Sequence, residues 1–246
     1  MKKVLKFLGY GIAALIIVGV IAGFIANEPM PTQQKAGAPA DELARKMESA
    51  VNKAAWDQTR FVSWKFISGT SYIWDKDRKA VVVEWGDNKV LLNTADQTGL
   101  VYVGGQLVTD AETKQKLLNK AWSQFANDSF WLCAPMKAFD PGTRREIATN
   151  KAGEEGLLVH YSSGGVTPGD SYLWLLDESG KPKAWQMWVN IIPVGGLQYS
   201  WEDWSGGANE PQIALQHDGA LLDVPIKDLA YPSYTDENNP LKALWD

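Results

Sequence analysis

Two histidines are the residues of this chain that most directly suggest chemistry. His160 is followed by Ser162 and Ser163, and His217 by Asp218, so the types needed for a nucleophile, a base and an orienting acid are present. A hydrolase of this kind also needs a strand-turn-helix elbow such as G-x-S-x-G, which the sequence does not contain. We therefore predict no catalytic residues and no enzymatic activity.

The sequence offers few metal ligands. Two histidines and one cysteine, Cys133, are too few for a zinc site built from protein side chains alone or for a disulfide framework. The Gly-Gly pairs do not form G-x-G-x-x-G and are typical of turns. We expect no metal and no cofactor, and we expect Cys133 to be a small buried apolar residue.

A pair of carboxylates, Glu202 and Asp203, lies between Trp201 and Trp204. Carboxylates beside aromatic rings are the groups used in glycoside chemistry. Neighbouring residues of a strand face opposite ways, however, so these two side chains would not flank one bond. A carbohydrate-binding face remains open as an alternative.

The amino terminus carries a candidate membrane anchor. Lys2, Lys3 and Lys6 precede an unbroken apolar run over 7–26, and 20 residues at about 1.5 Å each span roughly 30 Å, the thickness of a bilayer core. The alternative is a cleaved signal peptide with a site near 20–22. The length of the run favours an uncleaved transmembrane helix over 1–26.

The charge distribution predicts the orientation of this anchor. Three lysines precede the run and only Lys35 follows soon after it, so the amino terminus is expected in the cytoplasm and the main domain in the periplasm or outside the cell. Secretion after signal cleavage is the alternative. The whole chain has a net charge of −5, and removing those three lysines leaves 21 basic and 29 acidic residues, a net charge of −8. This acidity argues against a nucleic-acid partner.

The residues after the apolar run divide into a linker and one domain. Three prolines and a glycine over 27–40 predict an extended linker. Asp41 then precedes Leu43 and Met47 at helical spacing, which predicts a helix whose first turn Asp41 caps. No change of composition follows, so 41–246 is expected to be a single exported domain.

Period-two alternation and short turns predict about a dozen antiparallel strands. The expected strands cover 61–68, 70–75, 79–85, 89–94, 100–103, 106–108, 144–149, 156–161, 171–177, 183–191, 197–204, 211–215 and 220–224. Thr109 and Glu112 form a capping box before an apolar stripe, which predicts a helix over 110–126. The expected fold is mainly β, of the α+β class: a large curved antiparallel sheet or unclosed barrel of about 11 strands, with about two helices over its concave face.

Alternation places large aromatic side chains on one face of these strands. If the sheet is curved, this face lines a trough for an apolar ligand, and the candidate ligand-binding residues are Trp64, Phe66, Tyr72, Trp74, Val83, Trp85, Trp122, Trp131, Tyr172, Trp174 and Trp201. The alternative is an ordinary core, because each tryptophan buries on the order of 200 Å². The free volume inside the domain distinguishes the two.

The stretch 127–142, NDSFWLCAPMKAFDPG, resembles a signature of a group of bacterial envelope proteins, N-D-(S/T)-(F/Y)-W-L-x-x-P-x-K before a D-P-G turn. This group in turn resembles the carriers and receptors that move lipoproteins to the outer membrane. That resemblance implies an eleven-stranded unclosed barrel with helices plugging a hydrophobic cavity for acyl chains. Carriers are normally soluble and receptors lipidated, so an apolar protein anchor departs from the pattern. No functional residue is transferred.

These observations predict a membrane-tethered extracytoplasmic protein that binds a lipid or a lipoprotein acyl chain without chemistry. One alternative is an interaction module with a solid core that presents a surface to an envelope protein partner. The other is a carbohydrate-binding or glycosidase-like domain.

Overall fold

The computed structural model describes residues 27–219 and 221–246. The predicted transmembrane segment, 1–26, lies outside them. Among the described residues, none of the helices combines the length and apolar character needed to cross a membrane.

One sheet is built from the first half of the domain and a late strand. Its seven strands are antiparallel throughout, and β15 joins it at the edge formed by β2. In spatial order they are β15 (Lys227–Ala230), β2 (Phe61–Lys65), β3 (Ser71–Asp75), β4 (Ala80–Trp85), β5 (Asn88–Asn93), β6 (Gly99–Val103) and β7 (Gln106–Leu107).

The second half of the domain forms another antiparallel sheet, of six strands. In spatial order these are β1 (Gln34–Ala36), β8 (Thr143–Thr149), β9 (Glu155–Tyr161), β10 (Asp170–Leu176), β11 (Pro182–Trp188) and β12 (Leu197–Ser200). A two-stranded ribbon follows, β13 (Glu202–Ser205) with β14 (Ile213–Gln216).

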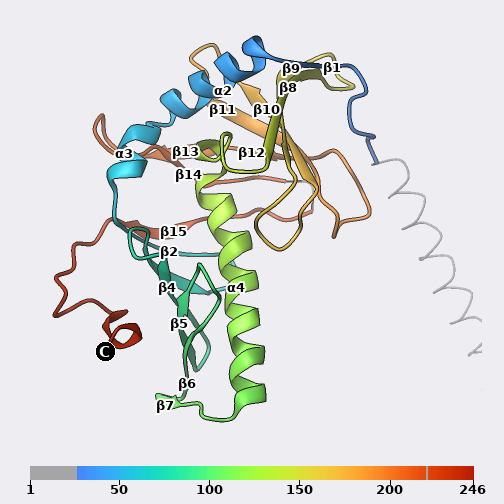
Figure 1. Ribbon diagram of the computed structural model, residues 1–246. Helices are drawn as coiled ribbons and strands as arrows, with labels where there is room; N and C mark the ends of the chain where they lie inside the picture. The colour runs from blue at the N-terminus through green and yellow to red at the C-terminus, as the bar shows by residue number, and fades with distance from the viewer. Residues whose placement is uncertain (1–26, 220) are drawn as a thin grey trace, which may run out of the picture.

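The helices lie on these sheets. A short pair precedes β2, and the long helix α4 connects the two sheets, as Figure 1 shows. Their bounds are α2 (Ala38–Ala50), α3 (Lys53–Gln58), α4 (Ala111–Cys133) and the 3-10 turns η1 (Ala134–Met136) and η2 (Lys242–Leu244).

The fold is therefore mainly β, of the α+β class, antiparallel and unclosed, as predicted. The expectation of one large sheet is wrong, because the strands divide between two sheets. The reason lies in α4, whose 23 residues at 1.5 Å each carry the chain about 35 Å from β7 to β8. After that distance β8 pairs with β9 and β1 and does not extend the first sheet.

Helix α4 is longer than the sequence pattern predicted. It begins as expected, but Asp110 is its N-cap, with a side-chain oxygen accepting a hydrogen bond from the Thr113 backbone N–H at 2.8 Å. It continues seven residues beyond Ala126, because Leu132 and Cys133 extend the buried stripe. The chain then tightens into η1, which contains Pro135. The first seven residues of the signature stretch 127–142 are thus part of α4.

The segment 27–40, predicted as an extended linker, packs on the domain. Its residues Gln34–Ala36 form β1, which pairs with β8. Helix α2 starts at Ala38 with Gly37 as N-cap, so Asp41 does not cap it. Asp41 instead accepts a hydrogen bond from Nε of Arg145 at 2.6 Å, which fixes the first turn of α2 to β8.

Two predicted strands near the carboxyl terminus differ from the structure. The strand over 197–204 divides at Trp201, because the residues before it pair with β11 as β12 and those after it pair with β14 as β13. Residues 221–224, predicted as the end of a strand, are irregular, and the strand that forms is β15.

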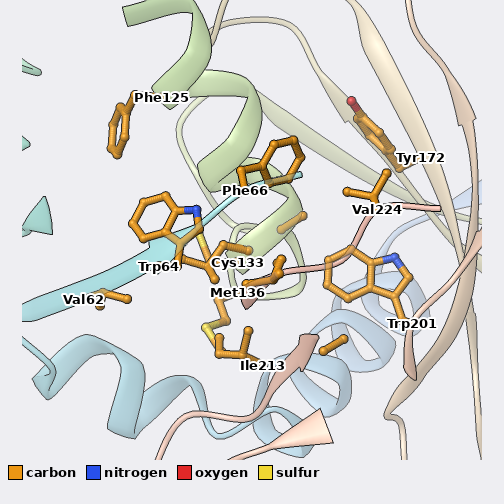
Figure 2. Packing of buried hydrophobic residues seen from close by; sticks show 14 of the residues in the cluster. Val62, Trp64, Phe66, Phe125, Cys133, Met136, Tyr172, Trp201, Ile213 and Val224 are labelled. Carbon is orange, nitrogen blue, oxygen red and sulfur yellow. The ribbon is translucent and has the colours of Figure 1, made fainter. Parts of the chain in front are cut away.

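The largest apolar cluster joins both sheets, because side chains of each meet against the end of α4, and two smaller clusters lie apart from it. Figure 2 shows Trp64 of β2 and Phe66, which follows β2, on one side, Tyr172 and Trp201 on the other, and Cys133 between them. Trp64 stacks on Tyr72 with ring centroids 4.5 Å apart.

A buried carboxyl group ties α4 to the first sheet. Asp128, in the second half of α4, accepts a hydrogen bond from the Tyr72 hydroxyl at 2.5 Å and another from the Asn127 side-chain amide at 2.9 Å. Burial raises the pKa of Asp128 to about 6 in spite of these bonds. The native state therefore holds a proton that the unfolded chain releases near pH 4.

This shift predicts a stability that depends on pH. The stability that Asp128 contributes is fully present below about pH 4 and is lost as the pH rises to about 6. Between these values the buried carboxyl group keeps its proton, whereas the same group in the unfolded chain is ionised and hydrated. Two pKa units correspond to about 3 kcal/mol. Denaturant unfolding of wild type and Asp128→Asn between pH 4 and 8 measures it. The variant should gain stability relative to wild type as the pH rises, and a constant difference would contradict the assignment.

Candidate functional site

A cavity of about 500 Å³ lies between the second half of α4 and the six-stranded sheet. Most of its wall is apolar and aromatic. The lining side chains from α4 and the strands are Trp74, Trp122, Phe125, Ala126, Asn127, Ser129, Phe130, Trp131, Tyr161, Asp170, Tyr172, Trp185 and Met187. Those from loops are Lys137, Asp140, Pro141, Ser163, Gly164, Gly165, Val166, Thr167, Val189, Ile191 and Ile192.

Phe130 is the centre of the aromatic wall. Its ring lies 4.9 Å from that of Tyr172, 5.2 Å from Tyr161 and 5.9 Å from Trp185, measured between centroids. The next residue of the helix, Trp131, meets Trp185 edge-on at 4.8 Å. These contacts hold the rings in place. The space beside them that no side chain fills is the cavity.

The signature stretch 127–142 supplies much of this wall. Seven of its sixteen residues line the cavity: Asn127, Ser129, Phe130, Trp131, Lys137, Asp140 and Pro141. The stretch leaves α4, passes through η1 and turns back into β8, so it covers both the helical side of the cavity and part of its edge.

The structure separates the candidate ligand-binding residues into three groups. Trp74, Trp122, Trp131 and Tyr172 line the cavity. Trp64, Phe66, Tyr72, Val83, Trp174 and Trp201 are buried in the core beside it. Trp85 is half-buried, with the Lys120 ammonium 5.1 Å from its ring, and lies outside the cavity.

Several lining residues were absent from that set. Trp185 and Met187 share the alternating face of Trp174 and its neighbours, so strand parity was sufficient to include them. Phe130 was missed because α4 was expected to end before it. The lining residues over 163–167 and 189–192 lie on loops, where no periodic pattern exists to indicate a direction.

The charged groups at the cavity are satisfied within the protein. The Lys137 ammonium forms an ion pair with Asp140. Asp170 accepts hydrogen bonds from the Thr167 hydroxyl at 2.5 Å and from the Asn190 backbone N–H at 2.9 Å. The cavity thus presents no free countercharge for a strongly ionic ligand.

Tyr161 differs from these groups. Its hydroxyl oxygen is buried, and it has no hydrogen-bond partner among the described residues. Burial raises its pKa well above the usual value, so the group is a neutral hydroxyl at every ordinary pH.

His160 belongs to a network that resembles a catalytic triad in residue types. Its Nδ1 lies 2.8 Å from the Ser171 hydroxyl and its Nε2 2.9 Å from a Glu146 carboxylate oxygen. Ser171 is only 1% exposed, so its hydroxyl is buried between the strands. The hydroxyls of Ser162 and Ser163 donate instead to backbone carbonyls. The network joins β8, β9 and β10.

His217 and Cys133 are core residues. His217 is fully buried beside Trp131 and Trp201, and burial lowers its pKa to about 4, so the ring is neutral at pH 7. Burial raises the pKa of Cys133 to about 11, so the thiol is unreactive.

Glu202 and Asp203 are exposed on β13, outside the cavity.

Metal ligands do not gather in the described part of the chain: no group of three His, Cys, Asp or Glu residues lies within reach of one ion there.

Comparison with profiles of known protein families and with curated proteins gives no match for this sequence. The class of the protein is therefore defined by its architecture: two unclosed antiparallel sheets, one long helix and an apolar cavity beside that helix.

The unpaired hydroxyl of Tyr161 predicts an unusual response to substitution. Tyr161→Phe should leave the free energy of unfolding of lipid-free protein unchanged or raise it by about 1 kcal/mol, because an unsatisfied buried hydroxyl costs about 1–3 kcal/mol. Tyr72→Phe is the matched control and should lower it by about 1–3 kcal/mol, since its bond to Asp128 is lost. Equal losses in urea unfolding at pH 7 would show that Tyr161 has a partner.

Proposed function

We propose that this chain is a membrane-tethered extracytoplasmic protein that binds a lipid or a lipoprotein acyl chain in the cavity beside α4, without chemistry. The observation that carries the proposal is the aromatic cavity itself. Its volume of about 500 Å³ lies in the range of small-molecule sites, which is roughly 300–1,000 Å³.

Hydrocarbon burial alone is sufficient for useful affinity. Ten methylene groups at about 0.8 kcal/mol each contribute about 8 kcal/mol before the cost of association. Because the charges at the cavity are already paired, a ligand gains most from an apolar chain inside and leaves its polar group at the opening. An acyl chain with a polar end fits this arrangement. The arrangement also explains why the sequence contains no polar ligand-binding motif.

The resemblance of 127–142 to the envelope group also supports the proposal, because seven residues of that stretch line the cavity. We further propose that the two sheets and α4 are a variant of the unclosed barrel of lipoprotein carriers, with the helix beside the acyl-binding space. The apolar run over 7–26 supplies the tether, with the amino terminus in the cytoplasm.

One observation favours an envelope protein partner as a second function. Leu221 and Leu222 are adjacent and exposed, by 69% and 56%, outside the cavity. A contact there is independent of acyl binding and is compatible with it. The carbohydrate alternative has less support, because Trp201 is buried while Glu202 and Asp203 are exposed away from the cavity.

Filling the cavity tests acyl binding. Ser129→Phe places a ring on the wall beside Phe130, whereas Ser123→Phe places the same ring on the exposed side of α4. We expect Ser129→Phe to retain several-fold less lipid than wild type, and Ser123→Phe to retain a normal amount. The measurement is mass spectrometry of organic extracts from full-length protein purified in mild detergent.

Two outcomes contradict the proposal. Wild-type protein that carries no lipid would remove its basis. Equal retention by the two variants would show that lipid binds elsewhere on the chain, and would favour the interaction module.

A further inference from the structure

The first described residues are fixed beside the opening of the cavity. The Glu28 backbone N–H donates to the Gly195 carbonyl at 2.9 Å, and the indole N–H of Trp188 donates to the Glu28 carbonyl at 2.8 Å. The Gly195 N–H donates to the Asn27 side chain at 2.8 Å. The chain therefore enters the domain against the β11–β12 loop, 189–196, as the blue and orange segments of Figure 1 illustrate.

The same loop carries part of the cavity rim. Ile191, on this loop, is 71% exposed, and Val166, on the β9–β10 loop, is 43% exposed, and both line the cavity. The Asn190 side chain donates to the Pro168 carbonyl at 2.8 Å and so joins the two loops. We call 162–169 and 189–196 together the rim loops.

The rim loops are uncharged. Their sixteen residues include no Lys, Arg, Asp or Glu, in a chain of which 22% is charged. An exposed apolar surface without charge is costly in water and favourable at the boundary between lipid headgroups and acyl chains.

The position of the anchor brings this surface to the membrane. The apolar run ends at Ala26, and an extended chain advances at most about 3.6 Å per residue, so the outer end of a span over 7–26 lies within about 10 Å of Gly195. A domain held at that point by so short a connection keeps its rim loops at the bilayer surface.

We propose that the rim loops insert into the outer surface of the membrane that anchors the chain, so that the cavity opens onto the bilayer and takes its acyl ligand from there. The contact is apolar, since the exported part is acidic, and it requires no anionic lipid. This inference rests on the proposed function for the span and for the ligand.

Depth-dependent quenching tests the insertion. An environment-sensitive fluorophore is attached to Pro168→Cys and to Pro193→Cys, exposed rim-loop positions outside the cavity, and to Leu107→Cys on β7, which is also exposed. Cys133 is buried and its thiol is unreactive, so unsubstituted chain reports any background labelling. Full-length protein is placed in phosphatidylcholine vesicles with brominated acyl chains.

We expect a blue-shifted emission and loss of fluorescence at both rim positions, and neither change at Leu107. Rim labels that are no more quenched than Leu107 would overturn the insertion. Extraction of the same samples then separates the two claims: lipid retained without quenching leaves the acyl site standing, whereas quenching without retained lipid removes the acyl site and leaves the membrane contact.

Discussion

The packing of one long helix against two sheets determines the rest of this structure. Helix α4 packs Phe125 against the first sheet and Phe130 against the second, and the Tyr72–Asp128 hydrogen bond joins it to the first. The two sheets do not close around α4, and the rings beside Phe130 do not fill the space that remains. The cavity is a consequence of this arrangement.

The sequence was sufficient for most strands and for the fold class, because period-two alternation and short turns are local properties. It was not sufficient where contacts between residues far apart in the sequence determine the secondary structure. Gln34–Ala36 becomes a strand only because β8 is available to pair with it, and α4 continues past Ala126 because Leu132 packs in a core made by both sheets. Parity placed Trp174 and Tyr172 on one inward-facing side, yet it could not separate Trp174 in the core from Tyr172 on the cavity wall. It also selected Trp85, which is half-buried and lies outside the cavity.

The cavity, the rim loops and the amino-terminal entry lie at one place in the molecule. Gly195 receives the entering chain, and Ile191 lies four residues earlier on the same loop. The polar groups nearby are paired internally, as in Lys137 with Asp140, so the surface offers hydrocarbon contact in place of charge. The proposed tether, the proposed opening onto the membrane and the proposed acyl site therefore all depend on one local geometry.

We propose above all that an acyl ligand occupies the space beside Phe130. Native mass spectrometry of full-length protein, released from detergent after isolation from its own membrane, tests it most directly. Acyl binding in this cavity predicts a population heavier than the bare chain by the mass of one lipid or acyl group, which dissociates on activation without a covalent remnant. A spectrum with only the bare mass, under conditions that keep the domain folded, would contradict it.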